Sequence, residues 1–487
     1  MIILKDILYK VAIEAVKGST ELAINKIEFD SRKIEENDVF VAIRGTVFNG
    51  HDFIEKVINQ GATVIVCDTL PELIISGITY VLVNDTNLAL AFLAANYYGN
   101  PSKKLKLIGI TGTNGKTTVA SLLFQLFKKA GFKVGLLSTV KILVDDREYN
   151  ATHTTPDSLT INQYLSEMCA VGVTFCFMEV SSHGIHQKRS EALHFEGGIF
   201  TNLSHDHLDY HTTFAEYRDV KKSFFDFLPK TAFALTNVDD KNGVLMLQNT
   251  LARKRNYALK TYADYKAQIL ENQLSGLLLK INENEIWVRL IGTFNAYNLL
   301  AIYGAAVELG IEKLEALRIL SELESVSGRF QFIVSQTNIT AIVDYAHTPD
   351  ALENVIKTIN DIRSNNEQLI TVVGCGGDRD KSKRPIMADI ASANSNKVIL
   401  TSDNPRSENP ELIIAEMEVG VQSQNQRKVV AIVDRKQAIK TACQFAHSND
   451  IILIAGKGHE TYQEIKGIRH EFDDLKIVKE ILEQLEK

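Results

Sequence analysis

Residues 105–118, with the sequence LKLIGITGTNGKTT, constrain the fold of this chain more than any other segment. An apolar strand runs into a turn that contains glycines, and a helix then begins at a lysine followed by two threonines. This order is typical of a phosphate-binding loop. Gly112 and Gly115 let backbone N–H groups approach phosphate oxygens, Lys116 adds positive charge, and Thr117 can bind Mg²⁺. An ordinary glycine-rich loop is the alternative, but such a loop would not need a strand, a lysine, a threonine and a helix in this order. The segment predicts a nucleotide-binding α/β protein.

The length of the chain, 487 residues, is too great for one hydrophobic core and predicts about three domains. Short apolar runs alternate with helix-length segments in three blocks, which we place at residues 1–100, 101–328 and 329–487. Such alternation predicts mostly parallel sheets covered by helices. The fold class we expect is therefore α/β, with three domains. The central one has a parallel sheet like that of P-loop ATPases, and the C-terminal one is a Rossmann-like, doubly wound domain.

The apolar runs that we interpret as strands occur in all three blocks. In the first block they are residues 39–43, 62–67 and 80–83; in the second, after the phosphate loop, 173–180, 198–203 and 232–238; in the third, 340–344, 369–374, 398–402, 429–433 and 451–455. Every strand of the third block is followed by polar residues, and ligands of doubly wound sheets bind beyond the carboxyl ends of the strands. We therefore expect a binding site there.

Charge and apolar runs exclude several classes of protein. The net charge is −7, from 53 basic and 60 acidic residues, so a general nucleic-acid binder is disfavoured. No run of about 18 apolar residues is present, so no transmembrane helix is expected. The five cysteines are scattered without C-x-x-C spacing, which predicts neither a disulfide framework nor a zinc site. We expect a cytoplasmic protein that binds neither nucleic acid nor membrane.

Candidate metal ligands follow two strands of the central block. Glu179 ends one apolar run, and Asp206, His207 and Asp209 follow the next in the sequence TNLSHDHLDYH. Oxygen and imidazole ligands beside a phosphate loop indicate Mg²⁺ sites. A hydrogen-bonded, histidine-rich turn is the alternative, and the nearby phosphate loop favours metal binding.

A lysine pair, Lys221 and Lys222, lies in the helical segment YRDVKKSFF. A lysine pair is usually solvated, and at least one of these two should be. An amine with a lowered pKa can also react with CO₂ to form a carbamate, which replaces a cation by an anionic metal ligand. The sequence leaves both readings open.

Eight motifs in one order resemble the Mur ligase family, over nearly the whole chain. They are TGTNGKTT, MEVSSHG, TNLSHDHLDYH, GTFNAYN, DYAHTPD, GCGGDRDKSKRP, DNPR and GKGHE. The resemblance implies an ATP-dependent amide ligase of cytoplasmic peptidoglycan synthesis, at the third amino-acid-adding step. ATP, the co-substrate, would phosphorylate the terminal D-glutamate of UDP-MurNAc-L-Ala-D-Glu to an acyl phosphate, and the amine of an amino acid would then displace phosphate. Mg²⁺ is the implied cofactor, and a monomer is expected.

The resemblance also implies roles for individual residues. The implied catalytic residues are Lys116, Lys221 and His207, with Lys221 carbamylated because Tyr217 sets the register in its favour. The implied metal ligands are Thr117, Glu179 and His207. The implied ATP contacts are Gly112, Thr113, Asn114, Gly115, Lys116, Thr117, Thr118, Asn295, Asn298, Arg329 and Asp344. The implied contacts to the UDP-sugar peptide are Phe29, Ser31, Thr46, Val47, Phe48, Thr154, Thr155, Ser181, Gln187 and Arg189.

Arg406, in the DNPR motif, indicates which amino acid is added. Its guanidinium is suited to a carboxylate and would repel the ammonium of lysine. Meso-diaminopimelate carries an additional carboxylate at that end, so it is the expected substrate, and L-lysine is the alternative. The resemblance implies an amino-acid site of Arg379, Asp403, Asn404, Pro405, Arg406, Gly456 and Glu460, in which Glu460 could pair with the distal ammonium.

Two rival functions share some of these features. A folylpolyglutamate synthetase-like ligase would share the phosphate loop and the carbamate, but would not explain the FDSR and DNPR motifs. A GTPase switch would need an N-K-x-D strand end, and the nearest match is residues 236–239, TNVD.

Overall fold

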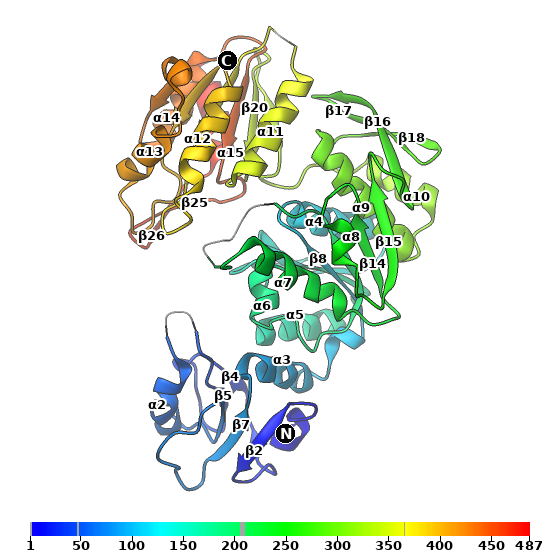
Figure 1. The fold of residues 1–487 in the computed structure, drawn as a ribbon, viewed down its shortest axis with the longest axis vertical. Helices are drawn as coiled ribbons and strands as arrows, with labels where there is room; N and C mark the ends of the chain where they lie inside the picture. Colours follow the sequence, from blue (N-terminus) through cyan, green and yellow to red (C-terminus); the bar gives the residue numbers. More distant parts are fainter. Residues whose placement is uncertain (1, 46–47, 205–209, 365) are drawn as a thin grey trace.

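The computed structural model describes residues 2–45, 48–204, 210–364 and 366–487. Three α/β domains follow one another along the long axis of the molecule, from the N-terminal domain at the bottom of Figure 1 to the C-terminal domain at the top. The predicted three-domain α/β class is thus confirmed, while the exact boundaries stay a prediction. Among the described residues, no helix is both long and apolar enough to span a bilayer.

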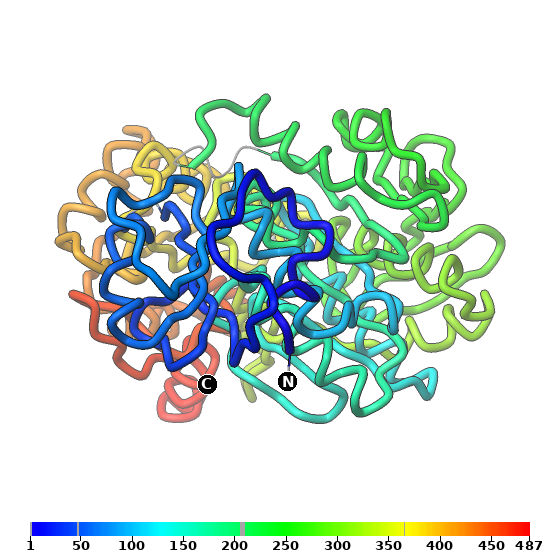
Figure 2. The backbone as a smooth tube through the Cα atoms, turned by 90° about the horizontal axis from the view of Figure 1, so that it is seen from below, coloured from blue at the N-terminus to red at the C-terminus, as the bar shows by residue number. Residues whose placement is uncertain are grey.

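The N-terminal domain contains a five-stranded sheet in the order β2-β7-β6-β5-β4. Its strands run parallel except for the antiparallel pair β2 and β7. The strands are β2 (Ile13–Lys17), β4 (Ile27–Glu28), β5 (Val39–Val41), β6 (Val64–Cys67) and β7 (Thr79–Val83), and β1 (Ile2–Ile3) pairs separately with β3 (Ala23–Ile24). The helices are α1 (Leu4–Ile7), α2 (Ile54–Asn59) and α3 (Thr86–Tyr97), with a 3₁₀ turn at Gly50–Phe53 before α2 and another at Pro101–Lys103 after α3. Viewed from below, this domain lies in front of the other two (Figure 2).

The central domain is built on an eleven-stranded sheet in the order β11-β10-β9-β12-β8-β13-β14-β15-β16-β17-β18. The seven strands from β9 to β16 in this order are parallel, and antiparallel hairpins extend both edges. The strands are β8 (Lys106–Thr111), β9 (Val134–Leu137), β10 (Lys141–Val144), β11 (Arg147–Asn150), β12 (Phe175–Glu179), β13 (Phe195–Phe200), β14 (Phe233–Asn237), β15 (Arg253–Ala258), β16 (Tyr265–Gln273), β17 (Gly276–Ile281) and β18 (Asn284–Val288).

Helices cover both faces of the central sheet because its inner strands are apolar on both sides. In β8, Ile108 and Ile110 belong to one buried core and Leu107 to another. The helices are α4 (Lys116–Lys129), α5 (Ser158–Ala170), α6 (Ser182–His186), α7 (Phe214–Asp226), α8 (Gly243–Met246), α9 (Thr293–Glu308) and α10 (Lys313–Ser321). A Cβ on Gly109 would lie 2.5 Å from the Phe224 ring, so glycine at this position lets α7 pack closely on the sheet.

The C-terminal domain has a six-stranded sheet in the order β19-β20-β24-β21-β22-β23. All neighbours are parallel except β19 and β20. The strands are β19 (Gln331–Val334), β20 (Thr340–Asp344), β21 (Leu369–Val373), β22 (Lys397–Leu400), β23 (Val429–Ala431) and β24 (Ile451–Ala455), followed by a hairpin of β25 (Tyr462–Ile465) and β26 (Ile468–Glu471). The helices are α11 (Pro349–Ile362), α12 (Lys383–Asn394), α13 (Pro410–Glu418), α14 (Arg435–Phe445) and α15 (Asp474–Gln484), with a 3₁₀ turn at Ser423–Lys428.

All predicted strands are present, within a few residues at their ends. The sequence prediction missed the edge hairpins of the central sheet and also two of its inner strands, β9 and β15. β11 has no buried residue and β16 is buried mainly at its start, so neither forms the continuous apolar run by which the inner strands were recognised.

Candidate active site

The phosphate loop lies between β8 and α4, as predicted. Gly112 and Gly115 have φ values of 148° and 87°, in the region that favours glycine. A Cβ on Gly112 would lie 2.0 Å from Thr201 Oγ1. The helix α4 begins without a side-chain cap, and Lys116 Nζ donates to the carbonyl oxygens of Gly112 (2.9 Å) and Thr113 (2.8 Å). The first N–H groups of α4 and the lysine therefore gather at one place, as an anion site requires.

Residues after β13 hold this loop in shape. Asn114 N donates to Asn202 Oδ1 (3.0 Å), Thr113 N donates to Asn202 O (2.8 Å), and Thr201 Oγ1 donates to Asn114 O (2.6 Å). Sequence reasoning did not assign Thr201 or Asn202 a role, although they stand in the TNLS motif. The backbone of the phosphate loop is thus preorganised by a neighbouring strand end.

Thr117 and Glu179 are neighbours because β8 and β12 are adjacent parallel strands. Thr117 Oγ1 donates to Glu179 Oε2 at 3.1 Å, and the fully buried carboxylate also accepts from Thr139 N at 2.8 Å. A hydroxyl and a carboxylate are hard oxygen donors that suit Mg²⁺, which usually takes one or two carboxylates and completes its shell with phosphate and water. No group of three His, Cys, Asp or Glu side chains in the described part of the chain could hold a metal. The predicted ligand His207, with Asp206 and Asp209, lies outside the described residues.

The two lysines of α7 have different surroundings. Lys221 is buried, its Nζ donates to Gly112 O at 2.9 Å, and it lies 4.8 Å from the centre of the Tyr217 ring. Lys222 is also buried, and it pairs with Asp226 one turn along the helix, at 2.7 Å, so the expectation that at least one of the two lysines is solvated is wrong. Lys221 is therefore the lysine beneath the phosphate loop, and its carbamylation stays a prediction.

A cavity of about 570 Å³ opens beside the phosphate loop, within the range of small-molecule sites. Its walls include the predicted ATP residues Asn114, Gly115, Thr118, Asn295, Asn298, Arg329 and Asp344. Arg329 Nη2 donates to Thr117 Oγ1 (3.0 Å) and its guanidinium lies 4.5 Å over the Tyr345 ring. Asp344 accepts from Phe330 N at 2.7 Å, and burial raises the pKa of its carboxyl. The central and C-terminal domains thus both contribute to this cavity.

Asp239, in the TNVD sequence, is unsuited to reading guanine. Its carboxylate accepts from the backbone N–H groups of Leu259, Lys260 and Thr261 at 2.8–2.9 Å, and from the Tyr297 hydroxyl at 2.9 Å. These hydrogen bonds keep the pKa of Asp239 well below its usual range although burial opposes them. The residue fixes the wall of the cavity, which disfavours a GTPase switch.

Several residues predicted to bind the UDP-sugar peptide lie together at the start of α6. Thr155 Oγ1 lies 3.1 Å from Ser181 Oγ, Arg189 Nη1 donates to Thr155 O at 2.7 Å, and Arg189 Nη2 donates to Gln187 Oε1 at 2.6 Å. Thr154 bonds to Thr139 Oγ1 at 3.1 Å and lines the cavity that connects the phosphate loop to the predicted amino-acid site.

The predicted uridine residues lie farther away, in the N-terminal domain. Phe29 lines a separate cavity of about 330 Å³ together with residues of the central domain such as Asp157, and Ser31 follows in the same turn. Phe48 is 71% exposed. Thr46 and Val47 lie outside the described residues. The structure therefore leaves the uridine contacts as predictions.

A cavity of about 360 Å³ connects the phosphate loop to the predicted amino-acid site. At one end lie Thr113, Lys116, Thr117 and Glu179. At the other lie Arg379, Asp403, Asn404, Arg406, Gly456 and Glu460. Pro405 stands between Asn404 and Arg406 in the loop after β22. A phosphorylated acid and an amine could meet within this single space.

Lys457 is a residue of this site that sequence reasoning missed, although it belongs to the GKGHE motif. Its buried Nζ lies 3.0 Å from both Glu460 Oε2 and Asn404 Oδ1. Glu460, expected to meet a substrate ammonium, therefore has a lysine partner here. Burial, and then the nearby Asp403, raises the pKa of Glu460.

Other residues that sequence reasoning left without a role line the cavities. Tyr345 and His347 lie in both, and Asp350 in the larger one; all three belong to the DYAHTPD motif. Motif membership was the only signal that could have identified them.

Family models match all three parts of the chain. A model described as "Mur ligase family, catalytic domain" matches residues 23–98, "Mur ligase middle domain" matches residues 110–306, and "Mur ligase, glutamate ligase domain" matches residues 328–458.

Similar proteins also match over the full length. A UDP-N-acetylmuramoyl-L-alanyl-D-glutamate--2,6-diaminopimelate ligase from Cytophaga hutchinsonii is 53% identical over 485 residues, which cover 99% of this chain and 100% of that protein. An enzyme of the same name from Phocaeicola vulgatus is 52% identical and covers 98% of this chain and 99% of its own. A solved structure with that name has a TM-score of 0.70 and 33% identity, and the match covers 100% of this chain and 99% of that one.

Proposed function

The chain belongs to the Mur ligase family, and we propose that it joins meso-diaminopimelate to UDP-MurNAc-L-Ala-D-Glu, with ATP converted to ADP and phosphate. The single cavity that connects the phosphate loop to Arg379 and Arg406 carries this proposal. One end can hold the triphosphate and the other an amino acid with an additional carboxylate. The reaction belongs to cytoplasmic peptidoglycan synthesis, and we expect the enzyme to act as a monomer, without nucleic acid or membrane.

The first step would transfer the γ-phosphoryl group of ATP to the D-glutamate carboxylate. Lys116 and the first N–H groups of α4 would neutralise charge on the phosphoryl oxygens, which is the main electrostatic task of phosphoryl transfer. Bound Mg²⁺ would supply further neutralisation of phosphate charge, with Thr117, Glu179 and His207 as its proposed ligands. Arg329, which contacts Thr117 from the C-terminal domain side, is placed to approach the same phosphates.

The second step would bring the amine of diaminopimelate to the acyl phosphate. The amine would attack the carbonyl carbon, a tetrahedral intermediate would form, and phosphate would leave with the C–O bond electrons while the amine loses a proton. Arg379 and Arg406 would hold the distal carboxylate, and Glu460 would face the distal ammonium. L-lysine lacks that carboxylate and would place its ammonium beside Arg406, so it should be a poor substrate.

The Lys221 carbamate is a further part of the proposal. Loss of one proton from the Lys221 ammonium would give the free amine, and addition of CO₂ to Nζ with loss of a second proton would then place an anion beneath Gly112 where the cation had been. The contact of Lys221 with the loop carbonyl supports this site rather than Lys222, which is also buried but pairs with Asp226.

The rival functions have less support. A folylpolyglutamate synthetase-like ligase would leave the FDSR and DNPR motifs without a role, and relatives of 53% and 52% identity carry the diaminopimelate ligase name. A guanine-specific switch conflicts with the occupied carboxylate of Asp239.

A coupled assay of phosphate release tests the proposal. The purified chain is given Mg·ATP and UDP-MurNAc-L-Ala-D-Glu, and then meso-diaminopimelate, L-lysine or L-glutamate in separate reactions. We expect release that depends on both the UDP precursor and meso-diaminopimelate, with the tripeptide product confirmed by mass spectrometry. Preference for L-lysine, or release without the UDP precursor, would contradict the assignment.

A further inference from the structure

Two loops of the C-terminal domain present the arginines of the amino-acid site. The first runs from residue 374 to the start of α12 and carries Arg379, and the second follows β22 and carries Arg406. Both arginines line the cavity that reaches the phosphate loop, but Asp378, Ser407 and Glu408 are absent from its walls. These three residues can influence the substrate only through their neighbours.

The two loops touch backbone to backbone. Gly377 N donates to Asn404 O at 2.9 Å, and a Cβ on Gly377 would lie 2.0 Å from Pro405 O. The guanidinium of Arg406 donates from Nη1 to Gly377 O at 2.7 Å. The position of the first loop therefore sets where the Arg406 guanidinium lies.

Both loops contain a residue in the left-handed region. Asp378 has a φ of 53° and Arg406 a φ of 51°. This conformation is unfavourable for residues other than glycine, so surrounding contacts must maintain it. Asp378 supplies such contacts by accepting from Ser407 Oγ at 2.6 Å and from Ser407 N at 3.2 Å.

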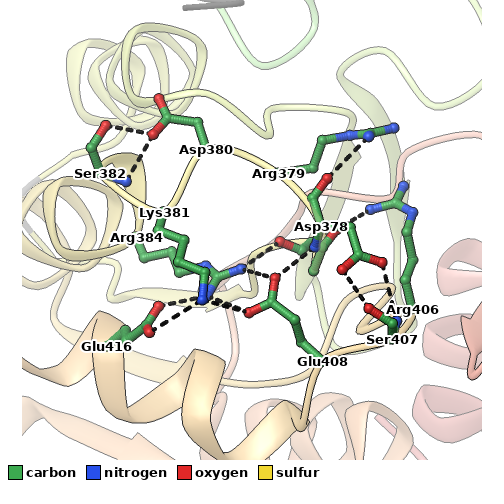
Figure 3. Close-up of polar contacts among 12 residues, drawn as sticks. Asp378, Arg379, Asp380, Lys381, Ser382, Arg384, Arg406, Ser407, Glu408 and Glu416 are labelled. Carbon is green, nitrogen blue, oxygen red and sulfur yellow. Dashed lines mark hydrogen bonds and ion pairs between the residues drawn. The ribbon is translucent and has the colours of Figure 1, made fainter. Parts of the chain in front are cut away.

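Glu408 joins these loops to a buried cation. Its Oε1 accepts from Asp378 N at 2.6 Å, and its carboxylate receives two hydrogen bonds from Arg384, at 2.8 and 3.0 Å. The Arg384 side chain is fully buried, whereas that of Glu408 is 19% exposed. Figure 3 shows Arg384 between Glu408 and Glu416, with Asp378, Arg406 and Ser407 on the other side of Glu408. A buried arginine needs such partners, so this pairing resists displacement.

We propose that Asp378, Ser407 and Glu408, held by Arg384, are positioning residues that keep Arg406 oriented toward the distal carboxylate of the amino-acid substrate. This inference rests on the proposed use of meso-diaminopimelate. Loss of the Glu408 charge would free the 374–382 loop, displace Gly377 O, and leave the Arg406 guanidinium with many orientations instead of one. Preorganisation of Arg406 should strengthen binding of the distal carboxylate and have little effect on binding of ATP or the UDP precursor.

Steady-state kinetics of Glu408→Gln test the proposal. We expect its KM for meso-diaminopimelate to rise by roughly ten- to a hundredfold, the range for loss of a charge-assisted contact. The KM values for ATP and for UDP-MurNAc-L-Ala-D-Glu should stay within about twofold of those of the unmodified enzyme. Ser407→Ala, a milder change, should raise the same KM by a smaller factor. Glu416→Gln is the matched control, because Glu416 bonds to the same Arg384 at 2.5 Å from α13, and its contact with the first loop is a 3.9 Å pair with Lys381 rather than a bond to Asp378 or Ser407. It should leave all three KM values unchanged.

A double-mutant cycle separates positioning from general destabilisation. In an Arg406→Ala background, Glu408→Gln should add only a small further increase in KM, because it acts through Arg406. An equal fold-change in both backgrounds would overturn the proposal, as would a normal KM for meso-diaminopimelate in folded Glu408→Gln and Ser407→Ala. If the unmodified enzyme shows no release that depends on meso-diaminopimelate, the proposed function fails together with this inference. If the unmodified enzyme shows that release and the variants have a normal KM for meso-diaminopimelate, the inference alone fails.

Discussion

The chemical environment of Lys221 is set by the residues that surround it in the folded structure. It and Lys222 are adjacent in sequence and on the same helix, yet one lies beneath Gly112 and the other pairs with Asp226. A helix turns by about 100° per residue, so adjacent side chains point in different directions. The local surroundings of Lys221, rather than its residue type, make it a candidate for modification.

Replacement of Lys221 by alanine should lower ligation by at least about a hundredfold, because a charge beside the phosphate loop is lost. If Lys221 is carbamylated, added formate, acetate or propionate should restore part of the activity by occupying the vacated space. The measurement is phosphate release at saturating substrates. Lys222→Ala, on the same helix, is the control and should keep normal activity. Undiminished turnover in Lys221→Ala would count against any role of this lysine.

His459 should make the stability of the folded protein depend on pH. Burial, and then the nearby side chains of Arg329, His347 and Lys457, lowers the pKa of His459 to about 3. The native protein therefore leaves this imidazole neutral at pH 5, while the unfolded chain, with a pKa of about 6.5, takes up a proton. The unfolded state binds more protons, so this group opposes folding increasingly as the pH falls below 6.5.

We expect His459 to account for about 2 kcal/mol of lost stability between pH 7 and pH 5. His459→Asn should show a smaller decrease in melting temperature over that interval, measured by calorimetry. His470→Asn, at an exposed position in β26, is the control and should keep the normal pH dependence. An identical pH dependence in His459→Asn would show that the residue does not act in this way.

At the scale of elements, a buried ion pair connects two helices to a strand end in the C-terminal domain. Arg435 begins α14 and Asp474 begins α15, and two hydrogen bonds of 2.7 and 2.9 Å join them, with neither side chain exposed. Arg435 also donates to Ala455 O, at the end of β24, at 3.0 Å. Gly456 of the proposed amino-acid site follows directly in the sequence, so this pair would hold that part of the site in position.

Asp474→Ala should destabilise the C-terminal domain by about 3–5 kcal/mol, because it leaves a buried arginine without its carboxylate. Glu471→Ala is the control, since the Glu471–Lys476 pair has side chains that are 87% and 63% exposed. Pairs of that kind contribute about 0–1 kcal/mol. Calorimetric melting of both variants measures the difference, and equal melting temperatures would contradict the assigned role of the pair.

At the scale of the whole molecule, the central and C-terminal domains meet through polar contacts at the phosphate loop. Asp350 near the start of α11 accepts from Asn114 Nδ2 at 2.9 Å and from Ser204 Oγ at 3.0 Å, both at the same oxygen. Arg329 contacts Thr117 in the same region. Because these contacts involve the phosphate loop itself, nucleotide binding and domain arrangement should be coupled.

Asp350→Ala should therefore loosen the two domains in the absence of nucleotide. Small-angle scattering should give a larger radius of gyration than for the unmodified protein, and the KM for ATP should rise. Glu353→Ala, at an exposed position on the same helix, is the control and should change neither quantity. An unchanged radius of gyration together with an unchanged KM for ATP would show that Asp350 does not hold the two domains together.

Features that depend on neighbouring residues could be predicted from the sequence. The phosphate loop, the strands β8, β12, β13 and β14 and the residues after strand ends were predictable, because apolar runs, glycines and helix starts act over a few positions. The strands β11, β15 and β18 were missed because they are exposed or half-buried over most of their length and carry no continuous apolar run, and β9, β10 and β17 were missed although they are largely buried.

Tertiary structure alone decided which distant residues meet. Asp350 contacts Asn114 across 236 positions, Lys457 pairs with Glu460, and Glu408 joins Arg384 to the loop of Arg406. The physical reason is that strand order and domain packing place side chains by contacts between remote segments. The motifs contain all of these residues except Glu408, but no motif contains the distances and the burial that decide how their charges interact.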